Sequence, residues 1–120
     1  MGVDLKAVQA LDLWRGAIVE SVRREAPDLS ARQMALLLTV YLSAPPHTVR
    51  GLAVALNVSK PAVTRALDRL SEYGLIRRKV DDADRRSVLI QRTVKGSVFL
   101  REFGDIIVAA AAKADGANQG

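Results

Sequence analysis

Basic side chains between residues 59 and 86 have the clearest capacity for binding chemistry in this sequence. Lys60, Arg65 and Arg69 follow one another at intervals of five and four residues. Five further basic residues form two clusters beyond them: Arg77, Arg78, Lys79, Arg85 and Arg86. Lysine and arginine neutralise phosphate oxygens, and the two-pronged guanidinium group can also pair with O6 and N7 of guanine. The pattern therefore predicts a surface that binds a polyanion.

The distribution of charge along the chain supports this prediction. The net charge is +5, but residues 50–101 hold 12 Lys and Arg against 5 Asp and Glu, a local charge of +7. The rest of the chain holds 6 basic and 8 acidic residues, a local charge of −2. A basic middle with near-neutral ends favours one electropositive face, with a separate role for the ends.

Enzymatic chemistry is not indicated by the residue types present. Cysteine is absent, which excludes thiolate metal sites, cysteine nucleophiles and disulfides. The single histidine, His47, follows Pro45-Pro46 in an expected loop, where a structural or solvent-exposed role is the usual one. No nucleophile–His–Asp arrangement and no glycine-rich phosphate loop is present. We therefore expect no catalytic residues, no metal and no cofactor.

A membrane role is also not indicated. No apolar run approaches the ~20 residues that a bilayer span requires. The first residues, MGVDLKAVQ, lack the charged region followed by an apolar region that marks a secretory signal. A cytoplasmic protein without membrane contact is the expectation.

Two short helices with a tight turn between them are predicted to carry the basic residues. Thr48 is a suitable N-cap for a helix that ends at Leu56, and Asn57-Val58 forms the turn. Ser59 caps the next helix, in which Pro61 is tolerated because amides of the first turn have no partner within the helix. Helix, turn and second helix together form a helix-turn-helix motif.

The outward face of the second helix, residues 59–73, is set by its apolar residues. With Val63, Leu67 and Leu70 buried, rotation by 100° per residue places five side chains outside: Pro61, Thr64, Arg65, Asp68 and Arg69. We expect Arg65 to read guanine, Thr64 to contact a thymine methyl group or a phosphate, and Lys60 to neutralise the backbone. We expect Asp68 to pair with a basic neighbour such as Arg65.

A two-stranded hairpin is predicted to follow. Residues 75–80 and 87–93 are rich in β-formers, and a polar turn, Asp81 to Arg86, separates them. An arginine at the tip of such a ribbon suits the negative potential of the minor groove. Asp84 lies two residues before Arg86 and can hold its guanidinium group.

Helices are also predicted on either side of this middle segment. Apolar residues recur every three to four positions in residues 3–25 and again in residues 94–113. Ser30 with Gln33 has capping-box spacing and predicts the start of a further helix. Thr93 caps the last helix, and residues 115–120 are predicted to form a disordered tail.

The stretch VSKPAVTRALDRLSEYGLIRRKVDDADRRSVLIQRTVKG, residues 58–96, resembles the MarR family of transcriptional regulators. The shared features are the serine-initiated helix, the L-x-x-x-G-L-I-x-R exit, the D-x-R motif and the closing T-x-x-G, and the resemblance covers residue 30 to about residue 103. It implies that Thr64 and Arg65 contact the major groove, that Asp84 shapes the hairpin, or wing, and that Arg86 enters the minor groove.

The resemblance to the MarR family also implies a fold, an assembly and a DNA-binding surface. It implies a mainly α winged helix-turn-helix fold, about five helices plus a two-stranded wing, in a single domain of residues 1–114 with a DNA-binding core at 30–93. It also implies a homodimer formed through residues 3–25 and 94–113, which acts at the nucleoid on double-stranded DNA with a pseudo-palindromic operator. The predicted DNA-contact set is Thr48, Ser59, Lys60, Pro61, Thr64, Arg65, Arg69, Arg78, Asp84, Arg85 and Arg86.

Two further readings stay open at this point. Family members often bind a small anionic or aromatic effector, for which Trp14 and Tyr41 are candidate lining residues, although their spacing fits ordinary core or dimer positions as well. A winged helix can also act mainly through a protein partner, as an antitoxin or a phage-type regulator. A module of that kind would tolerate acidic residues at Lys60, Arg65 and Arg86.

Overall fold

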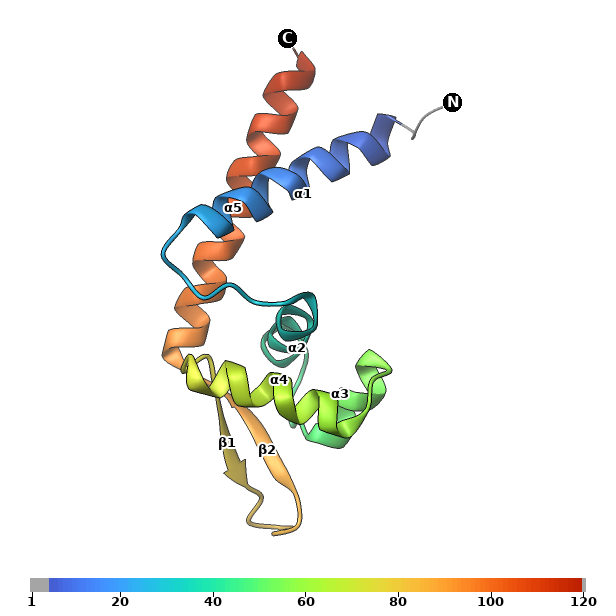
Figure 1. The fold of residues 1–120 in the computed structure, drawn as a ribbon, viewed down its shortest axis with the longest axis vertical. Helices are drawn as coiled ribbons and strands as arrows, with labels where there is room; N and C mark the ends of the chain where they lie inside the picture. The colour runs from blue at the N-terminus through green and yellow to red at the C-terminus, as the bar shows by residue number, and fades with distance from the viewer. Residues whose placement is uncertain (1–4, 120) are drawn as a thin grey trace. The chain divides into compact units, whose positions relative to one another are not determined.

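The computed structural model describes residues 5–119, with side chains for residues 6–114, as five helices and two strands. The mainly α fold with a small hairpin, expected from the sequence, is confirmed (Figure 1). In chain order the elements are α1 (Leu5–Arg23), α2 (Ala31–Leu42), α3 (Val49–Leu56), α4 (Lys60–Glu72), β1 (Ile76–Val80), β2 (Val88–Arg92) and α5 (Val94–Gln119).

The chain forms two compact units. Unit 1 comprises Met1–Asp28 and Leu100–Gly120, and unit 2 comprises Leu29–Phe99. Helix α5 contributes its first residues to unit 2 and the remainder to unit 1.

Unit 2 encloses the larger apolar core. Helices α2, α3 and α4 pack on one another, and the strands contact all three helices. The largest side chains with almost no exposed surface come from these helices, from the first strand and from the turn after α4: Leu36, Leu37, Val40, Leu52, Val63, Leu67, Leu70, Leu75 and Ile76. This shared core fixes the orientation of α4, and therefore which of its side chains face outward.

Side-chain caps define where the helices of unit 2 begin. Ser30 and Gln33 form the expected capping box: the Gln33 amide donates to Ser30 Oγ at 3.1 Å, and the Ser30 amide donates to Gln33 Oε1 at 2.9 Å. Thr48 Oγ1 accepts from the Gly51 amide at 3.0 Å at the start of α3. Each bond satisfies a backbone amide that has no partner within the helix.

Two residues with positive φ make the turns on either side of α4. Asn57 ends α3 with φ 54° and ψ 48°, the left-handed conformation that asparagine tolerates better than most residues. Gly74 follows α4 with φ 76°, where a side chain would be strained. These two turns confirm the predicted breaks between the helices and before the hairpin.

The hairpin is antiparallel, with Ile76 opposite Arg92 at its base and Val80 opposite Val88 near its tip. Its second strand also bridges to the segment before α3, where the Ile90 amide donates to the His47 carbonyl at 2.9 Å. Ribbon β1–β2 projects beyond helices α2–α4 within unit 2 (Figure 1). The ribbon is therefore held to the segment before α3 through the middle of β2, and the loop beyond Val80 and Val88 extends past the helices.

The Tyr41 hydroxyl joins three segments of unit 2. It donates to the Leu75 carbonyl at 2.6 Å and accepts from the Thr93 amide at 2.9 Å. Thr93 Oγ1 in turn accepts from the Gly96 amide at 2.9 Å, as the predicted cap of α5. A Cβ atom at Gly96 would overlap the Tyr41 hydroxyl and the Leu75 carbonyl, so only glycine fits there.

Unit 1 consists of α1 and the larger part of α5. Ala17 is fully buried, and Phe103 and Ile106 are nearly so. Trp14 packs edge-on against Phe103, with ring centroids 6.2 Å apart and planes at 79°. The apolar stripe that predicted α1 is nevertheless largely exposed, and its members keep 38–63% of their surface open: Val8, Leu11, Trp14, Ile18 and Val22.

The ends of the terminal helices differ from the sequence-based boundaries. Helix α5 continues to Gln119, so residues 115–119 are helical rather than the disordered tail that we expected. The alanines that precede them have the highest helix propensity of any residue, which favours continuation. Residues 1–4 and 120 lie outside the described part of the chain. None of the helices in residues 5–119 combines the length and apolarity that a membrane span demands.

Candidate nucleic-acid interface

The exposed face of α4 carries the side chains predicted from its periodicity. Val63, Leu67 and Leu70 are fully buried, whereas Thr64 and Arg65 are exposed. The other predicted members of the row, Pro61, Asp68 and Arg69, are exposed as well, and so is Lys60 in the first turn. The buried apolar row therefore holds a polar row at the surface in a fixed orientation.

The first turn of α4 is a positive helix end. Ser59 is its N-cap, and Ser59 Oγ accepts from the Ala62 amide at 3.3 Å. Pro61 occupies the second helical position, where it has no amide to leave unpaired. The aligned peptide dipoles and the exposed Lys60 ammonium group both favour a negatively charged partner at this end.

Arg65 and Arg69 differ in how much of their binding capacity is free. Within the described residues, Arg65 has no hydrogen bond or ion pair. Arg69 Nη1 donates to Glu72 Oε2 at 3.1 Å, and its guanidinium group lies 5.5 Å from the centre of the Tyr73 ring. The hydrogen bond to Glu72 raises the pKa of Arg69 above its already high ordinary value. Of the two arginines of α4, Arg65 is thus the one whose guanidinium group has no partner among the described residues.

The ion-pair partner of Asp68 differs from the one that the sequence suggested. Its carboxylate pairs with Arg78 on β1, not with Arg65 on its own helix. The reason is tertiary: β1 contacts α4, which brings a cation from the hairpin beside the carboxylate. The pairing ties the base of the hairpin to α4 and removes a negative charge from competition for Arg65.

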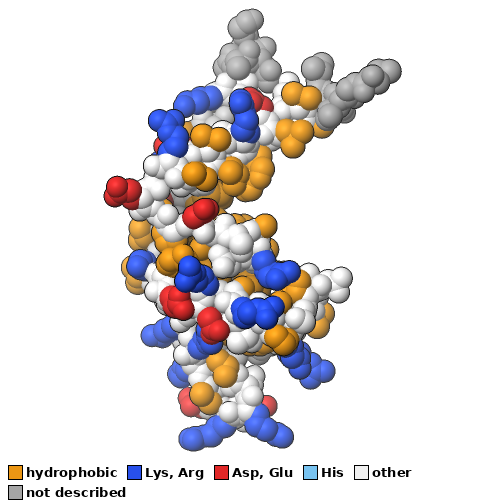
Figure 2. Space-filling model, viewed as in Figure 1, with side chains coloured by type: hydrophobic (Ala, Val, Ile, Leu, Met, Phe, Trp, Pro, Cys, Tyr) orange, Lys and Arg blue, Asp and Glu red, His pale blue; other side chains and the backbone are white. Residues whose placement is uncertain are grey.

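The tip of the hairpin is a compact loop organised by two aspartates. Asp81 Oδ1 accepts from the Ala83 amide at 2.9 Å, and Asp84 Oδ1 accepts from the Arg86 amide at 3.1 Å. Asp84 Oδ1 also lies 3.7 Å from Arg86 Nε, as the sequence predicted. The Arg86 side chain remains 97% exposed, and Arg85 beside it is exposed too. Figure 2 shows Lys and Arg side chains at this end of the hairpin.

Arg92 contributes to the fold in a way that the sequence did not indicate. Its Nε donates to the Val40 carbonyl and its Nη2 to the Ser43 carbonyl, both at 2.9 Å. These carbonyls belong to the C-terminal end of α2, where cations are stabilising. His47 Nε2 lies 3.2 Å from the same Ser43 carbonyl, so the one histidine is a buried structural residue. Arg92 therefore belongs to the basic segment of residues 50–101, but its guanidinium group is bound to the end of α2.

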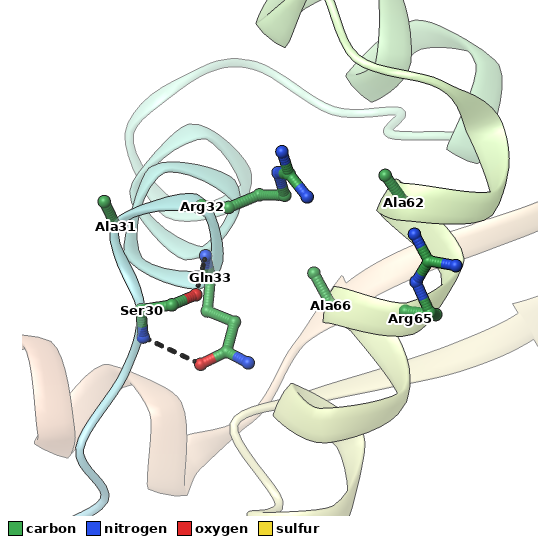
Figure 3. Close-up of a pocket in the computed structure, with 7 residues that line it drawn as sticks. All are labelled: Ser30, Ala31, Arg32, Gln33, Ala62, Arg65 and Ala66. Atoms are coloured by element: carbon green, nitrogen blue, oxygen red, sulfur yellow. Dashed lines mark hydrogen bonds between the residues drawn. The ribbon is translucent and has the colours of Figure 1, made fainter.

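The proposed effector residues are in different units. Trp14 lies on α1 in unit 1, in contact with Phe103, and Tyr41 lies on α2 in unit 2 with its hydroxyl hydrogen-bonded. A pocket of unit 2 has a different lining: Ser30, Ala31, Arg32, Gln33, Ala62, Arg65 and Ala66 (Figure 3). Among the residues with described side chains, no group of three His, Cys, Asp or Glu could hold a metal ion.

Helices α3 and α4 with their tight turn, followed by a hairpin with a basic tip, define a winged helix-turn-helix protein. A family model described as the MarR family matches residues 29–88, which is 60 of the 120 residues. The chain therefore belongs to the MarR family of transcription regulators.

Solved structures agree with this fold. A mutant of MepR from S. aureus is 22% identical with a TM-score of 0.74, and the match covers 93% of this chain and 82% of that chain. YusO from Bacillus subtilis is 23% identical with a TM-score of 0.73, over 89% and 74% of the two chains. The S. aureus MepR–DNA complex is 22% identical with a TM-score of 0.70, over 96% and 90%.

Proposed function

We propose that this regulator binds double-stranded DNA sequence-specifically as a homodimer, with one α4 helix in each of two successive major grooves. The observation that carries the proposal is the pair of accessible cationic groups in unit 2: Arg65 on α4 and the exposed Arg86 at the wing tip. Arg65 reads base edges, while Arg86 reaches the minor groove beside them.

The phosphate backbone supplies the larger share of the affinity in this proposal. Lys60 and the first turn of α4 are suited to neutralising phosphates, and Arg85 is a further exposed cation at the wing. A DNA complex is the subject of one of the similar solved structures, that of S. aureus MepR, which supports the same partner here.

The apolar surface of unit 1 supports the homodimer. Leu11 is 61% exposed and Val22 is 63% exposed, although both belong to the apolar stripe of α1. Exposed apolar rows of this kind mark association surfaces. A second copy presents the same rows, so a two-fold interface buries both at once. The dimer then sets the spacing of the two α4 helices, about 10 base pairs, and requires a pseudo-palindromic site.

Binding to genomic DNA tests the proposal most simply. We expect mapping of bound fragments in cells to return a pseudo-palindromic motif at promoters, where the protein competes with polymerase in the nucleoid. Affinity for such a site should fall about 10³–10⁵-fold between 50 and 200 mM salt if 6–10 phosphates are neutralised. A salt-independent affinity, or enrichment of protein partners without DNA, would contradict the proposal and favour a protein-binding winged helix.

A further inference from the structure

A basic groove in unit 2 lies between the first turn of α2 and the side of α4 that carries Ala62, Arg65 and Ala66. It has a volume of about 400 Å³, and its lining comes from both helices. Figure 3 shows Arg32 extending from α2 toward α4, with Arg65 standing on α4 beyond Ala62 and Ala66. Two arginines from separate elements therefore border one surface hollow.

Small side chains keep the groove open between the arginines. Ala62 and Ala66 are almost completely buried and fill little space on α4. On the α2 side, Ser30 and Gln33 are locked into the capping box. The charged groups of the lining are the guanidinium groups of Arg32 and Arg65, and neither makes an ion pair or a hydrogen bond among the described residues.

The electrostatics of the groove favour an anion. Arg32 is the second residue of α2, at the end of the helix that already carries partial positive charge, where a cation is unfavourable. None of the seven lining residues is acidic. Arg32, the end of α2 and Arg65 therefore raise the local potential together, and a negative group in the groove relieves their mutual repulsion.

We propose that Arg32 binds a backbone phosphate of the DNA duplex, on the strand that flanks the major groove entered by α4. This inference rests on the proposed function and adds a contact from an element outside the helix-turn-helix and the wing. Arg65 both lines the groove and belongs to the exposed face of α4, so a duplex at that face passes the mouth of the groove.

The form of the groove favours a backbone phosphate over a free small anion. The hollow is open at the surface, and Ala62 and Ala66 separate its two arginines, so the charged groups do not enclose a ligand. A DNA backbone phosphate could be bound by Arg32 through a single oxygen, because α4 and the wing would hold the rest of the duplex. The contact fixes the position of α4 along the groove and carries no base information.

Replacement of Arg32 tests this contact without threatening the fold, because the side chain is exposed. Arg32→Gln removes one phosphate contact from each copy of the dimer, so it should weaken binding to specific and to random duplexes by the same factor and reduce the slope of log K against log salt by about 2. The loss at 0.1 M salt should therefore be about a hundredfold larger than the loss at 1 M. Arg32→Lys should keep the slope. Arg101→Gln removes an exposed charge from α5 in unit 1 and is the control: at a protein concentration where it is as dimeric as the wild type, it should change neither quantity.

A neutral-phosphate scan locates the contact. In operator duplexes that carry one methylphosphonate each, one position in each half-site, beside the major groove read by α4, should weaken binding of the wild-type protein but have no further effect on Arg32→Gln. An unchanged slope in Arg32→Gln, with Arg65→Ala still impaired, would overturn the Arg32 contact alone. A wild-type protein that does not bind DNA would overturn the proposed function itself.

A calorimetric titration with inorganic phosphate at constant ionic strength distinguishes the two sources of the anion. We expect no saturable binding by the protein without DNA. Saturable binding that Arg32→Gln abolishes, with DNA affinity unchanged, would make the groove a site for a small anion and would overturn the DNA contact.

Discussion

The two units of this chain treat their apolar side chains in opposite ways. In unit 2, Leu67 and the other apolar residues of α4 are buried, and the surface is left to cations such as Arg65. In unit 1, α1 buries Ala17 but leaves most of its larger apolar side chains open. Unit 2 thus has a closed core of its own, whereas unit 1 keeps an exposed apolar surface, which the proposed homodimer would cover.

Unit 2 itself contains two kinds of arginine, those bound to other parts of the fold and those without a partner in the described part of the chain. Arg78 and Arg92 are bound to Asp68 and to the end of α2, so they hold the hairpin against the helices. Arg65 and Arg85 have no such partners among the described residues. Local charge alone does not distinguish these roles, and we expect the arginines that are not bound to the fold, together with the exposed Arg86 at the wing tip, to contribute most of the arginine share of DNA affinity.

Truncation of a buried side chain in unit 2 should have the largest effect. Leu67→Ala removes a fully buried side chain from the centre of α4, and we expect a loss of about 2–5 kcal/mol in the free energy of unfolding. Urea denaturation followed by circular dichroism, at one protein concentration, measures it. A loss below about 1 kcal/mol would contradict the view that this unit has a closed core.

A charge on the exposed stripe of α1 should act on association instead. Leu11→Glu should raise the dimer dissociation constant at least tenfold, which is about 1.4 kcal/mol, because the carboxylate would be buried against the second copy. Sedimentation velocity over a concentration series gives this constant. Gln9→Glu adds the same charge at an exposed polar position of the same helix and serves as the control. An equal dimer constant for wild type and Leu11→Glu would remove α1 from the interface.

The two arginines of α4 should differ in their contribution to DNA binding. Arg65→Ala should cost about 1–3 kcal/mol and relax the base preference at one position in each half-site of the operator. Arg69→Ala should cost less, because Arg69 is already bound to Glu72. Fluorescence anisotropy with operator variants compares them. If the two losses are equal, the distinction between free and engaged arginines does not hold.

The wing should contribute the smallest and most sequence-dependent loss. Arg86→Ala should weaken binding by about 1 kcal/mol, mainly where A-tracts flank the site and narrow the minor groove. The measurement is the affinity for matched operators with AT-rich and GC-rich flanks. The same loss on both kinds of flank would indicate a phosphate contact in place of minor-groove insertion.

Features of the site that depend on neighbouring residues could be predicted from the sequence. The capping box of Ser30 and Gln33 closes over three residues, and the outward position of Arg65 follows from helical rotation once Val63 and Leu67 are assigned to the core. The left-handed turn at Gly74 was predictable for the same reason, since glycine is favoured at positive φ. The helix boundaries and the outward face of α4 could therefore be predicted from short stretches of sequence.

Features that depend on tertiary neighbours could not be predicted in this way. Asp68 meets Arg78 because β1 lies on α4, and the Arg32–Arg65 groove exists because α2 packs beside α4. Periodicity correctly predicted α1 as an amphipathic helix, but it does not state what covers the apolar side. The role of Arg92 was missed because its partners are carbonyl groups 49 and 52 residues away along the chain.

Hydroxyl-radical footprinting on a mapped operator tests the central claim most directly, because it reports the partner, the stoichiometry and the geometry together. We expect two protected segments related by two-fold symmetry, with centres about 10 base pairs apart, and loss of both segments with Arg65→Ala at matched concentration. A single unsymmetrical footprint, or no protection at low salt, would contradict a dimer that places two α4 helices on the duplex.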